Sequence, residues 1–401
     1  MKFRSISLLV IAELAAMSLW FVSAAILPDM LREADMGAGR QAALSSAVQA
    51  GFVVGALVSA IFGFADRHDP RHVFAITAIG AAAVNALLIV VPPGSIAAIA
   101  ARFATGALLA GVYPVGMKIA VGWSARDRAF LVGLLVGALT LGSASPFLMA
   151  FFGGGDWRAI VVWASLASAF AGLLCLFVRL GPHHQAAAAF DPRAILIAWT
   201  NRRVRLAYLG YLGHMWELYA MWAWIAAAVS ASYAVSMAES EATELGKFTA
   251  FCAIGLGGFA CVAAGVIGDR WGKAEMAAAA MAVSAASALL VAWSFGGPPW
   301  LTFTLAIIWG LSVVPDSAQF SALVADASPP EVSGSLLTLQ TALGFGLTIA
   351  TVQLFPFGVE AFGWPVTLSI LAAGPLFGIW AMLKLRALEN RAEDATLPVS
   401  K

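Results

Sequence analysis

Two glutamates stand inside apolar runs that are long enough to cross a membrane. Glu13 and Glu217 each begin the pattern Glu-Leu-x-Ala-Met, and a tryptophan follows at the same distance in both copies, Trp20 or Trp224. An ionisable group in hydrocarbon is costly, so its presence there indicates a function. A carboxyl group at that depth can load a proton on one side and release it on the other. We therefore expect Glu13 and Glu217 to be a proton-coupling pair in two related halves of the chain.

Further polar and aromatic residues fall within the same apolar runs. Asp316 follows Pro315, so it could be another proton-coupling site or could cap the helix that restarts after the proline. Arg102 needs a partner at its depth, either Glu13 or another group whose salt bridge fixes helix packing. The aromatic residues could form a wall around a substrate or pack the bundle. The residues that we expect to contact a substrate are Arg102, Tyr113, His214, Trp216, Tyr219, Trp222 and Gln340.

The composition places the chain in a membrane. It is 61 % hydrophobic and 11 % charged, whereas a soluble domain carries about 25 % charged residues. The formal net charge of +1 gives no indication of a nucleic-acid partner. The three cysteines lie in apolar runs, which argues against a disulfide framework. The basic N-terminus and the apolar stretch after it are expected to be an uncleaved first helix, because the stretch is long and contains Glu13.

The apolar runs predict an all-α membrane protein with twelve transmembrane helices in two pseudo-symmetric six-helix bundles. The predicted domains are an N-terminal bundle (1–180), a cytoplasmic linker (181–203), a C-terminal bundle (204–387) and a cytoplasmic tail (388–401). The predicted spans are 5–27, 42–64, 73–92, 95–118, 129–152, 157–179, 204–230, 245–267, 275–294, 300–323, 335–357 and 364–386.

The distribution of Lys and Arg predicts that both termini are cytoplasmic. With that orientation most basic residues outside the spans fall on the cytoplasmic side, as the positive-inside rule requires. The basic residues left for the segments on the other side are Arg32, Arg40, Arg158 and Lys247.

Three local patterns resemble those of the major facilitator superfamily. Residues 265–273 read Gly-Val-Ile-Gly-Asp-Arg-Trp-Gly-Lys, similar to the superfamily's loop between helices 2 and 3, and residues 63–71 are a degenerate copy. Arg102 and Gly106 match an Arg-x-x-x-Gly pattern in helix 4. The predicted helix 5, with three glycines before Pro146, loosely resembles the Gly-rich helix of the superfamily's exchangers.

This resemblance implies a transporter in which two bundles rock about a central site near the bilayer midplane. The loop residues of both copies would then gate the halves through contacts that form in one state and break in the other. The expected gating residues are Asp66, Arg67, Arg71, Asp269, Arg270 and Lys273.

We therefore expect a secondary active transporter that exports an amphipathic or cationic compound in exchange for protons. The alternative is proton-coupled uptake of a small organic or inorganic anion, anchored by Arg102. Transport powered by ATP is not expected, because the chain has no phosphate loop. An embedded enzyme or a sensor is disfavoured, and for an enzyme the chain has no His-Glu-x-x-His, no Gly-x-Ser-x-Gly and no cysteine cluster. No cofactor is expected. The expected partners are a small-molecule substrate, protons and the lipid bilayer, for a monomer in a bacterial inner membrane.

Overall fold

The computed structural model describes residues 1–396 except 63–66, 124–127, 154, 184–190 and 192. Helices make up most of this part of the chain and no strand occurs in it, so the predicted all-α fold is confirmed. The first half contains α1 (Lys2–Met17), α2 (Val22–Glu33), α3 (Ala38–Phe62), α5 (Pro70–Ala86), a short 3₁₀ helix (Leu87–Ile89), α6 (Ile96–Leu109), α7 (Tyr113–Val121), α8 (Arg128–Phe152) and α9 (Trp157–Cys175). The second half follows a short helix, α10 (Arg193–Thr200), and contains α11 (Arg202–Tyr233), α12 (Glu239–Trp271), α13 (Lys273–Trp293), α14 (Pro299–Val313), α15 (Ser317–Ala327), α16 (Pro330–Leu371) and α17 (Ala373–Thr396).

These helices provide the predicted twelve crossings. Among the described residues, ten continuous helical stretches are long and apolar enough to span a bilayer. The last of them, Glu331–Arg391, holds two crossings, because Gly363 breaks α16 with φ 79° and ψ 169°. The twelfth crossing is α11, which has 32 residues. The hydropathy of α11 is lower than that of the ten stretches, because Trp, Tyr, His and Glu residues are concentrated in this helix.

Three of the crossings are interrupted near mid-length. The first is divided into α1 and α2 by a turn at 18–21, the fourth into α6 and α7, and the tenth into α14 and α15. Pro114 stands just after the second of these breaks and Pro315 lies within the third, and each ring removes a backbone donor and blocks a regular helix. Pro146, by contrast, lies within the continuous helix α8. The breaks leave backbone carbonyl groups without helical partners at the depth where binding residues are expected.

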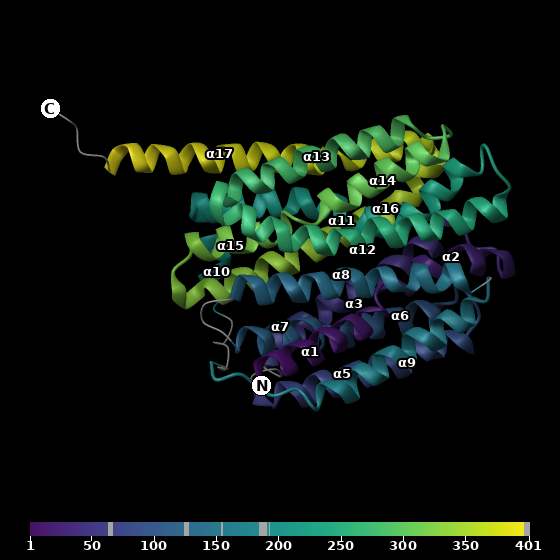
Figure 1. The fold of residues 1–401 in the computed structure, drawn as a ribbon, viewed down its shortest axis with the longest axis horizontal. Coiled ribbons are helices and arrows are strands. Elements are labelled where there is room, and N and C mark those ends of the chain that lie inside the picture. The colour runs from purple at the N-terminus through teal and green to yellow at the C-terminus, as the bar shows by residue number, and fades with distance from the viewer. Residues whose placement is uncertain (63–66, 124–127, 154, 184–190, 192, 397–401) are drawn as a thin grey trace.

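The two halves lie side by side with their helices roughly along one axis (Figure 1). The main contacts between them pair α3 with α16 and α8 with α12. These are the second and fifth crossings of each half, so the interface itself follows the two-fold relation between the halves. Glycines allow close packing there: a Cβ atom on Gly258 would lie only 3.0 Å from the carbonyl oxygen of Gly137.

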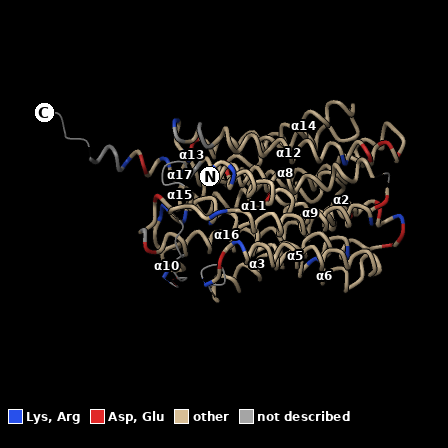
Figure 2. Tube along the Cα trace, turned by 60° about the horizontal axis from the view of Figure 1, so that its bottom comes forward, with Lys and Arg blue, Asp and Glu red and all other residues tan. Residues whose placement is uncertain are grey.

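Charged residues gather at the two ends of the bundle (Figure 2). We name the end that carries both chain termini and α10 the terminal end, and the other the opposite end. The segment between the halves is more helical than predicted, since it contains α10 and α11 already begins at Arg202, capped by Asn201. The helix α17 continues to Thr396, past the predicted end of the last span. The assignment of the terminal end to the cytoplasm stays a prediction.

The break at Gly363 yields a test of the division between the last two crossings of the chain. Its backbone conformation is one that only glycine adopts readily, so Gly363→Ala should lower the free energy of unfolding by about 1–3 kcal/mol. The measurement is thermal unfolding of the purified protein in detergent. Gly346→Ala, in the same helix and with open space around its Cα, is the matched control. Equal melting temperatures for the two variants would contradict the break.

Candidate functional site

Glu13 is completely buried and its carboxyl group has no hydrogen-bond partner among the described residues. It projects from α1 towards α7, where Gly116 leaves the space that the carboxyl group fills. Tyr113, one turn earlier on α7, lies close enough to interact electrostatically with Glu13 and with Tyr211 of the second half. An isolated carboxylate is very costly to bury, so this environment suits a carboxyl group that carries a proton.

Glu217 is equally buried but has two partners. The Ser284 hydroxyl on α13 donates to Oε2 over 2.8 Å, and the Trp309 indole on α14 donates to Oε1 over 2.7 Å. Two hydrogen bonds stabilise the charged form of a carboxyl group. The two glutamates therefore occupy comparable places in their halves with different chemical surroundings. Each points into its own half, and no contact joins them.

His214 and Asp316 form a second buried acid–base contact beside Glu217. His214 Nδ1 lies 2.9 Å from Asp316 Oδ1, and both side chains are almost fully buried. His214 precedes Glu217 by one helical turn, so the predicted shared face of α11 is confirmed. The Asp316 side chain makes no capping hydrogen bond to α15 and pairs with the histidine instead. His214 Nε2 has no partner among the described residues.

Arg102 binds neutral groups of its own half rather than Glu13. Its guanidinium donates to Ser23 Oγ (2.6 Å), Asn85 Oδ1 (2.7 Å), Leu19 O (2.7 Å) and Trp20 O (2.9 Å). The last two carbonyl groups belong to the turn that separates α1 from α2. The side chain therefore stabilises the interruption of the first crossing, and the predicted pairing of Arg102 with Glu13 is wrong.

An aromatic cluster joins the two halves. Its ring centroids lie 4.8–6.0 Å apart, distances typical of favourable aromatic pairs. Two of the predicted substrate-binding residues, Tyr219 and Trp222, belong to it. Trp216 does not, because its indole donates to the Ile370 carbonyl at the edge of the second half. Gln340 is buried on α16 with its amide nitrogen unpaired among the described residues. The cluster consists of Trp20, Phe21, Phe52, Tyr219, Trp222 and Phe345.

The predicted gating residues at the terminal end make contacts within their own halves. Arg71 lies 2.6 Å from Asp69 and Lys273 pairs with Asp326. The hydrogen bond from Arg71 lowers the pKa of Asp69 to about 2, so this pair contributes stability at neutral pH and loses it only as the pH falls towards 2. Arg67 and Arg270 are exposed. Asp66 lies outside the described residues, as does the side chain of Asp269.

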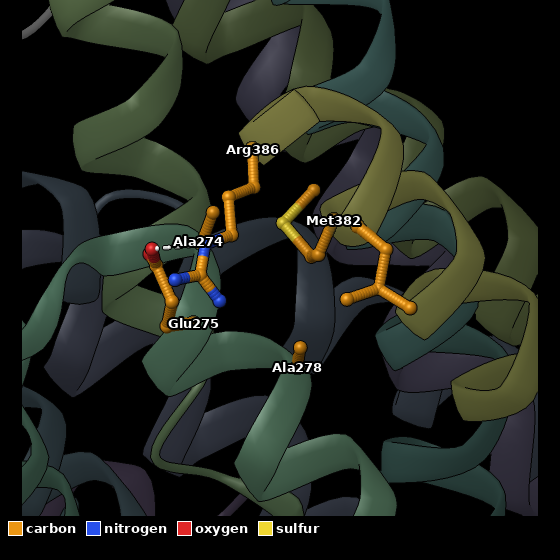
Figure 3. Close-up of a pocket in the computed structure, with 6 residues that line it drawn as sticks. Ala274, Glu275, Ala278, Met382 and Arg386 are labelled. Carbon is orange, nitrogen blue, oxygen red and sulfur yellow. Dashed lines mark ion pairs between the residues drawn. The ribbon is translucent and has the colours of Figure 1, made fainter. Parts of the chain in front are cut away.

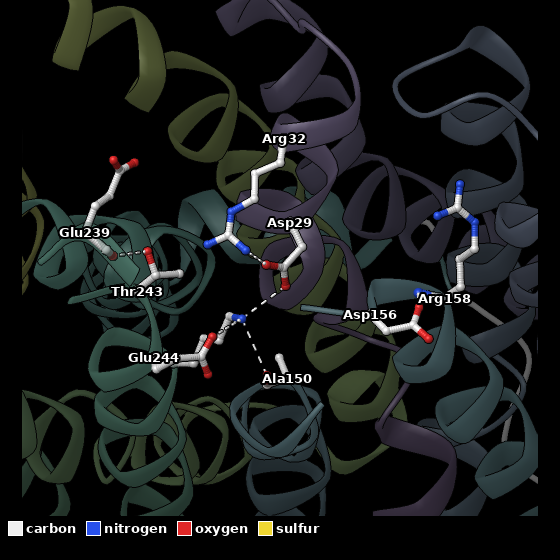
Figure 4. Close-up of polar contacts among 9 residues, drawn as sticks. Asp29, Arg32, Ala150, Asp156, Arg158, Glu239, Thr243 and Glu244 are labelled. Atoms are coloured by element: carbon white, nitrogen blue, oxygen red, sulfur yellow. Dashed lines mark hydrogen bonds and ion pairs between the residues drawn. The ribbon is translucent and has the colours of Figure 1, made fainter. Parts of the chain in front are cut away.

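The ion pair that joins the halves lies at the opposite end (Figure 4). Lys247 Nζ on α12 is 3.0 Å from Asp29 Oδ2 on α2, and both side chains are 1 % exposed. Glu244 and the Ala150 carbonyl also accept from Lys247, and Arg32 pairs with Asp29. Of the ion pairs between described residues, this is the one that crosses between the halves. Lys247 lies at the same end as Arg32 and Arg158, with which the sequence analysis grouped it, but the lysine is buried among acidic partners.

Sequence analysis missed Asp29 because it lies just beyond the predicted end of the first span, next to Pro28. A signal was present: an acidic residue at the end of one span and a basic residue at the start of another. Asn85 completes the arginine site and also donates to Ser165 over 3.0 Å. A small cavity of about 130 Å³ lies apart from all these residues, between α13 and α17, where Glu275 pairs with Arg386 at 2.9 Å (Figure 3). It is lined by none of the predicted site residues.

Comparison with known proteins identifies the family. A family model of the Major Facilitator Superfamily matches residues 8–350. The chain therefore belongs to the Major Facilitator Superfamily of membrane transporters. No curated protein matches the chain in sequence.

Solved structures with the same fold cover almost the whole chain. A structure of the nucleoside transporter NupG has a TM-score of 0.72 at 15 % identity and covers 95 % of this chain and 99 % of its own. A partially occluded inward-open structure of the xylose transporter XylE from E. coli has a TM-score of 0.74 at 12 % identity, with 96 % and 97 % covered. A D-xylose-proton symporter has a TM-score of 0.76 at 11 % identity, with the same coverage. At these identities the likeness concerns the fold alone.

The hydrogen bonds of Arg102 predict a structural role that lysine cannot fill. Arg102→Lys should lower the free energy of unfolding by about 2–3 kcal/mol, because a lysine cannot satisfy the same spread of acceptors and leaves buried carbonyl groups unpaired. Thermal unfolding in detergent measures the loss. Arg158→Lys, at an exposed pair with Glu33, should change the melting temperature little. A stable Arg102→Lys protein would contradict this role.

The buried ion pair at the opposite end predicts that substitutions of Asp29 and Lys247 have non-additive effects on the free energy of unfolding. Asp29→Asn should cost about 3 kcal/mol, because it removes the buried carboxylate that faces Lys247. The double variant Asp29→Asn with Lys247→Met should recover part of this loss, since it also removes the buried lysine charge, which Asp29→Asn leaves with Glu244 as its one acidic partner among the described residues. A double-mutant cycle from thermal unfolding measures the coupling. Strictly additive effects would show that the contact contributes nothing.

Proposed function

We propose that the protein exports an amphipathic or cationic small molecule in exchange for protons. The observation that carries this proposal is the pair of fully buried carboxyl groups, Glu13 and Glu217, on the first crossing of each half. They differ in their hydrogen-bond partners, so the two sites are chemically distinct. A pair of such sites suits proton exchange during a transport cycle.

Arg102 argues against the alternative of anion uptake. Four hydrogen bonds to neutral groups already engage its guanidinium, so an anion would have to displace structural contacts to reach it. The region between the halves instead presents aromatic rings, in the cluster around Trp20 and Tyr219. Aromatic faces attract cations and apolar groups. Both observations favour a cationic or amphipathic cargo.

Two of the solved structures with this fold come from proteins described as a nucleoside transporter and a D-xylose-proton symporter. They suggest a second candidate, proton-coupled uptake of a polar neutral solute. The amide nitrogen of Gln340, unpaired among the described residues, and the hydroxyl groups of Tyr113 and Tyr211 would supply hydrogen bonds for it. The aromatic cluster lacks the dense polar lining that such a solute requires, which is why export of an amphipathic compound is the stronger proposal.

The cycle that we propose is alternating access. The halves would be closed at the opposite end in one arrangement and closed at the terminal end in the other. At the opposite end the halves are held by the Asp29–Lys247 pair and by the hydrogen bond from Gln353 to Ser46. Along α3, every residue from Ala42 to Phe52 is buried or half-buried, whereas none is buried from Val53 to Phe62. This difference supports halves that separate towards the terminal end. With cytoplasmic termini, the structure would then be inward-facing.

We further propose that residues 1–180 and 204–387 are the two moving domains, with 181–203 as linker and 388–401 as tail. The bacterial inner membrane and a monomeric state remain part of this proposal. A monomer provides both sets of proposed coupling residues, so the cycle needs no second copy.

The proposal predicts that replacing either glutamate by glutamine abolishes proton-coupled transport but leaves the exchange of cargo for cargo. Glu13→Gln and Glu217→Gln should each abolish transport driven by a pH gradient in liposomes, because an amide cannot release a proton. Exchange of labelled for unlabelled cargo should persist, since it moves no net protons. Glu239→Gln, at an exposed acid outside the core, is the matched control.

The test uses three initial cargoes. Tetraphenylphosphonium represents a cationic substrate, glucose a neutral substrate and nitrate an anionic substrate. Wild-type transport of nitrate or glucose without transport of the organic cation would overturn the choice of cargo. Gradient-driven transport at wild-type rates in both glutamine variants would overturn the coupling residues.

A further inference from the structure

A cavity of about 330 Å³ lies between the halves at the opposite end. The first half contributes α2 and the start of α3, including Leu31 and Gln41. The second half contributes the far parts of α11 and α16 and the start of α12. A cavity of this size is at the lower end of the range for small-molecule sites. It is separate from Glu13, Glu217 and Arg102, none of which lines it.

One side of the cavity is formed by three aromatic rings of the second half. Trp224 and Phe355 stack with a centroid separation of 5.9 Å and an interplanar angle of 6°. Trp364 meets Phe355 at 6.0 Å. The Trp224 indole nitrogen donates to the Val352 carbonyl over 3.2 Å, which fixes the ring in place. The rings are therefore preorganised to contact a ligand rather than free to turn away.

Glu360 is the sole charged residue among the described residues that line the cavity. It is exposed, and no ion pair between described residues involves it. Of the basic residues nearby, Lys247 is engaged by Asp29 and Glu244 and Arg32 pairs with Asp29. Arg40 is exposed on α3 beside Gln41 but does not line the cavity. A ligand in this cavity thus meets aromatic faces and one carboxylate, with no basic side chain among the described residues of the lining. Both features attract a cation and reject an anion.

We propose that this cavity is a binding site for an organic cation with an apolar body. The ligand would contact α2 beside Asp29 and α16 across the interface, so it would bridge the halves while they are closed at this end. A compound that binds only the closed arrangement stabilises it by mass action. Occupancy would therefore hold this end shut and slow the transport cycle. The site does not depend on the direction of transport or on proton coupling.

Protection of an introduced cysteine tests the site directly. Gln41→Cys places a thiol in the cavity wall. The native Cys175 and Cys261 are buried, and labelling of the unsubstituted protein measures the background from Cys252. Tetraphenylphosphonium should slow alkylation of this thiol by N-ethylmaleimide in the purified protein. Adding Glu360→Gln should raise the concentration for half-protection roughly fivefold to tenfold, as expected for loss of a single charge contact. Glu239→Gln, an acidic residue at the same end outside the cavity, should leave it unchanged.

Three further measurements decide the identity of the occupant. Neutral triphenylphosphine oxide, of similar shape, should protect less well than the cation, and Val359→Trp should abolish protection by filling the cavity. Equal protection by the neutral compound, or an unchanged half-protection concentration in Glu360→Gln, would overturn the proposal. So would a native mass spectrum in which phospholipid stays bound and is not displaced by the cation. Melting curves without ligand show whether each variant is folded.

Discussion

Polar groups among these helices have to find their partners inside the protein, because hydrocarbon offers no water to bind them. Arg102 shows how this requirement shapes the fold. The first crossing is interrupted at 18–21, and the freed carbonyl groups of Leu19 and Trp20 are bound by a guanidinium from the fourth crossing. The interruption and the arginine depend on each other. Without the arginine the turn would leave buried acceptors unpaired, and without the turn the arginine would lack half of its acceptors.

Glu13 departs from this rule and Glu217 obeys it. The carboxyl group of Glu13 packs against Gly116 without a hydrogen-bond partner among the described residues, whereas Ser284 and Trp309 bind Glu217. A buried polar group without a hydrogen-bond partner lowers the stability of the fold, and such exceptions are expected at functional sites. Its presence at the same place in the repeat as Glu217 is what makes the pair informative about coupling, rather than either residue alone.

The sequence predicted the architecture well because membrane length and hydrophobicity are properties of single segments. The twelve crossings, the shared face of His214 and Glu217 and the aromatic character of α11 all follow from such local patterns. The partners of Arg102, the pair formed by Asp29 and Lys247, and the separation of Trp216 from the aromatic cluster could not be predicted that way. They depend on how helices rotate and approach one another, which one sequence without a structure does not specify.

The contact of Gly137 with Gly258 has a consequence for the movement of the halves. These glycines lie near the middle of α8 and α12, and no side chain separates the two backbones there. Surfaces that meet without interlocking side chains can turn against each other with little repacking. In the proposed cycle the crossing point is therefore suited to act as a fulcrum, about which one end of the molecule would widen as the other narrows. The axis of that rotation would pass through Gly137 and Gly258, where each residue has a hydrogen atom in place of a side chain.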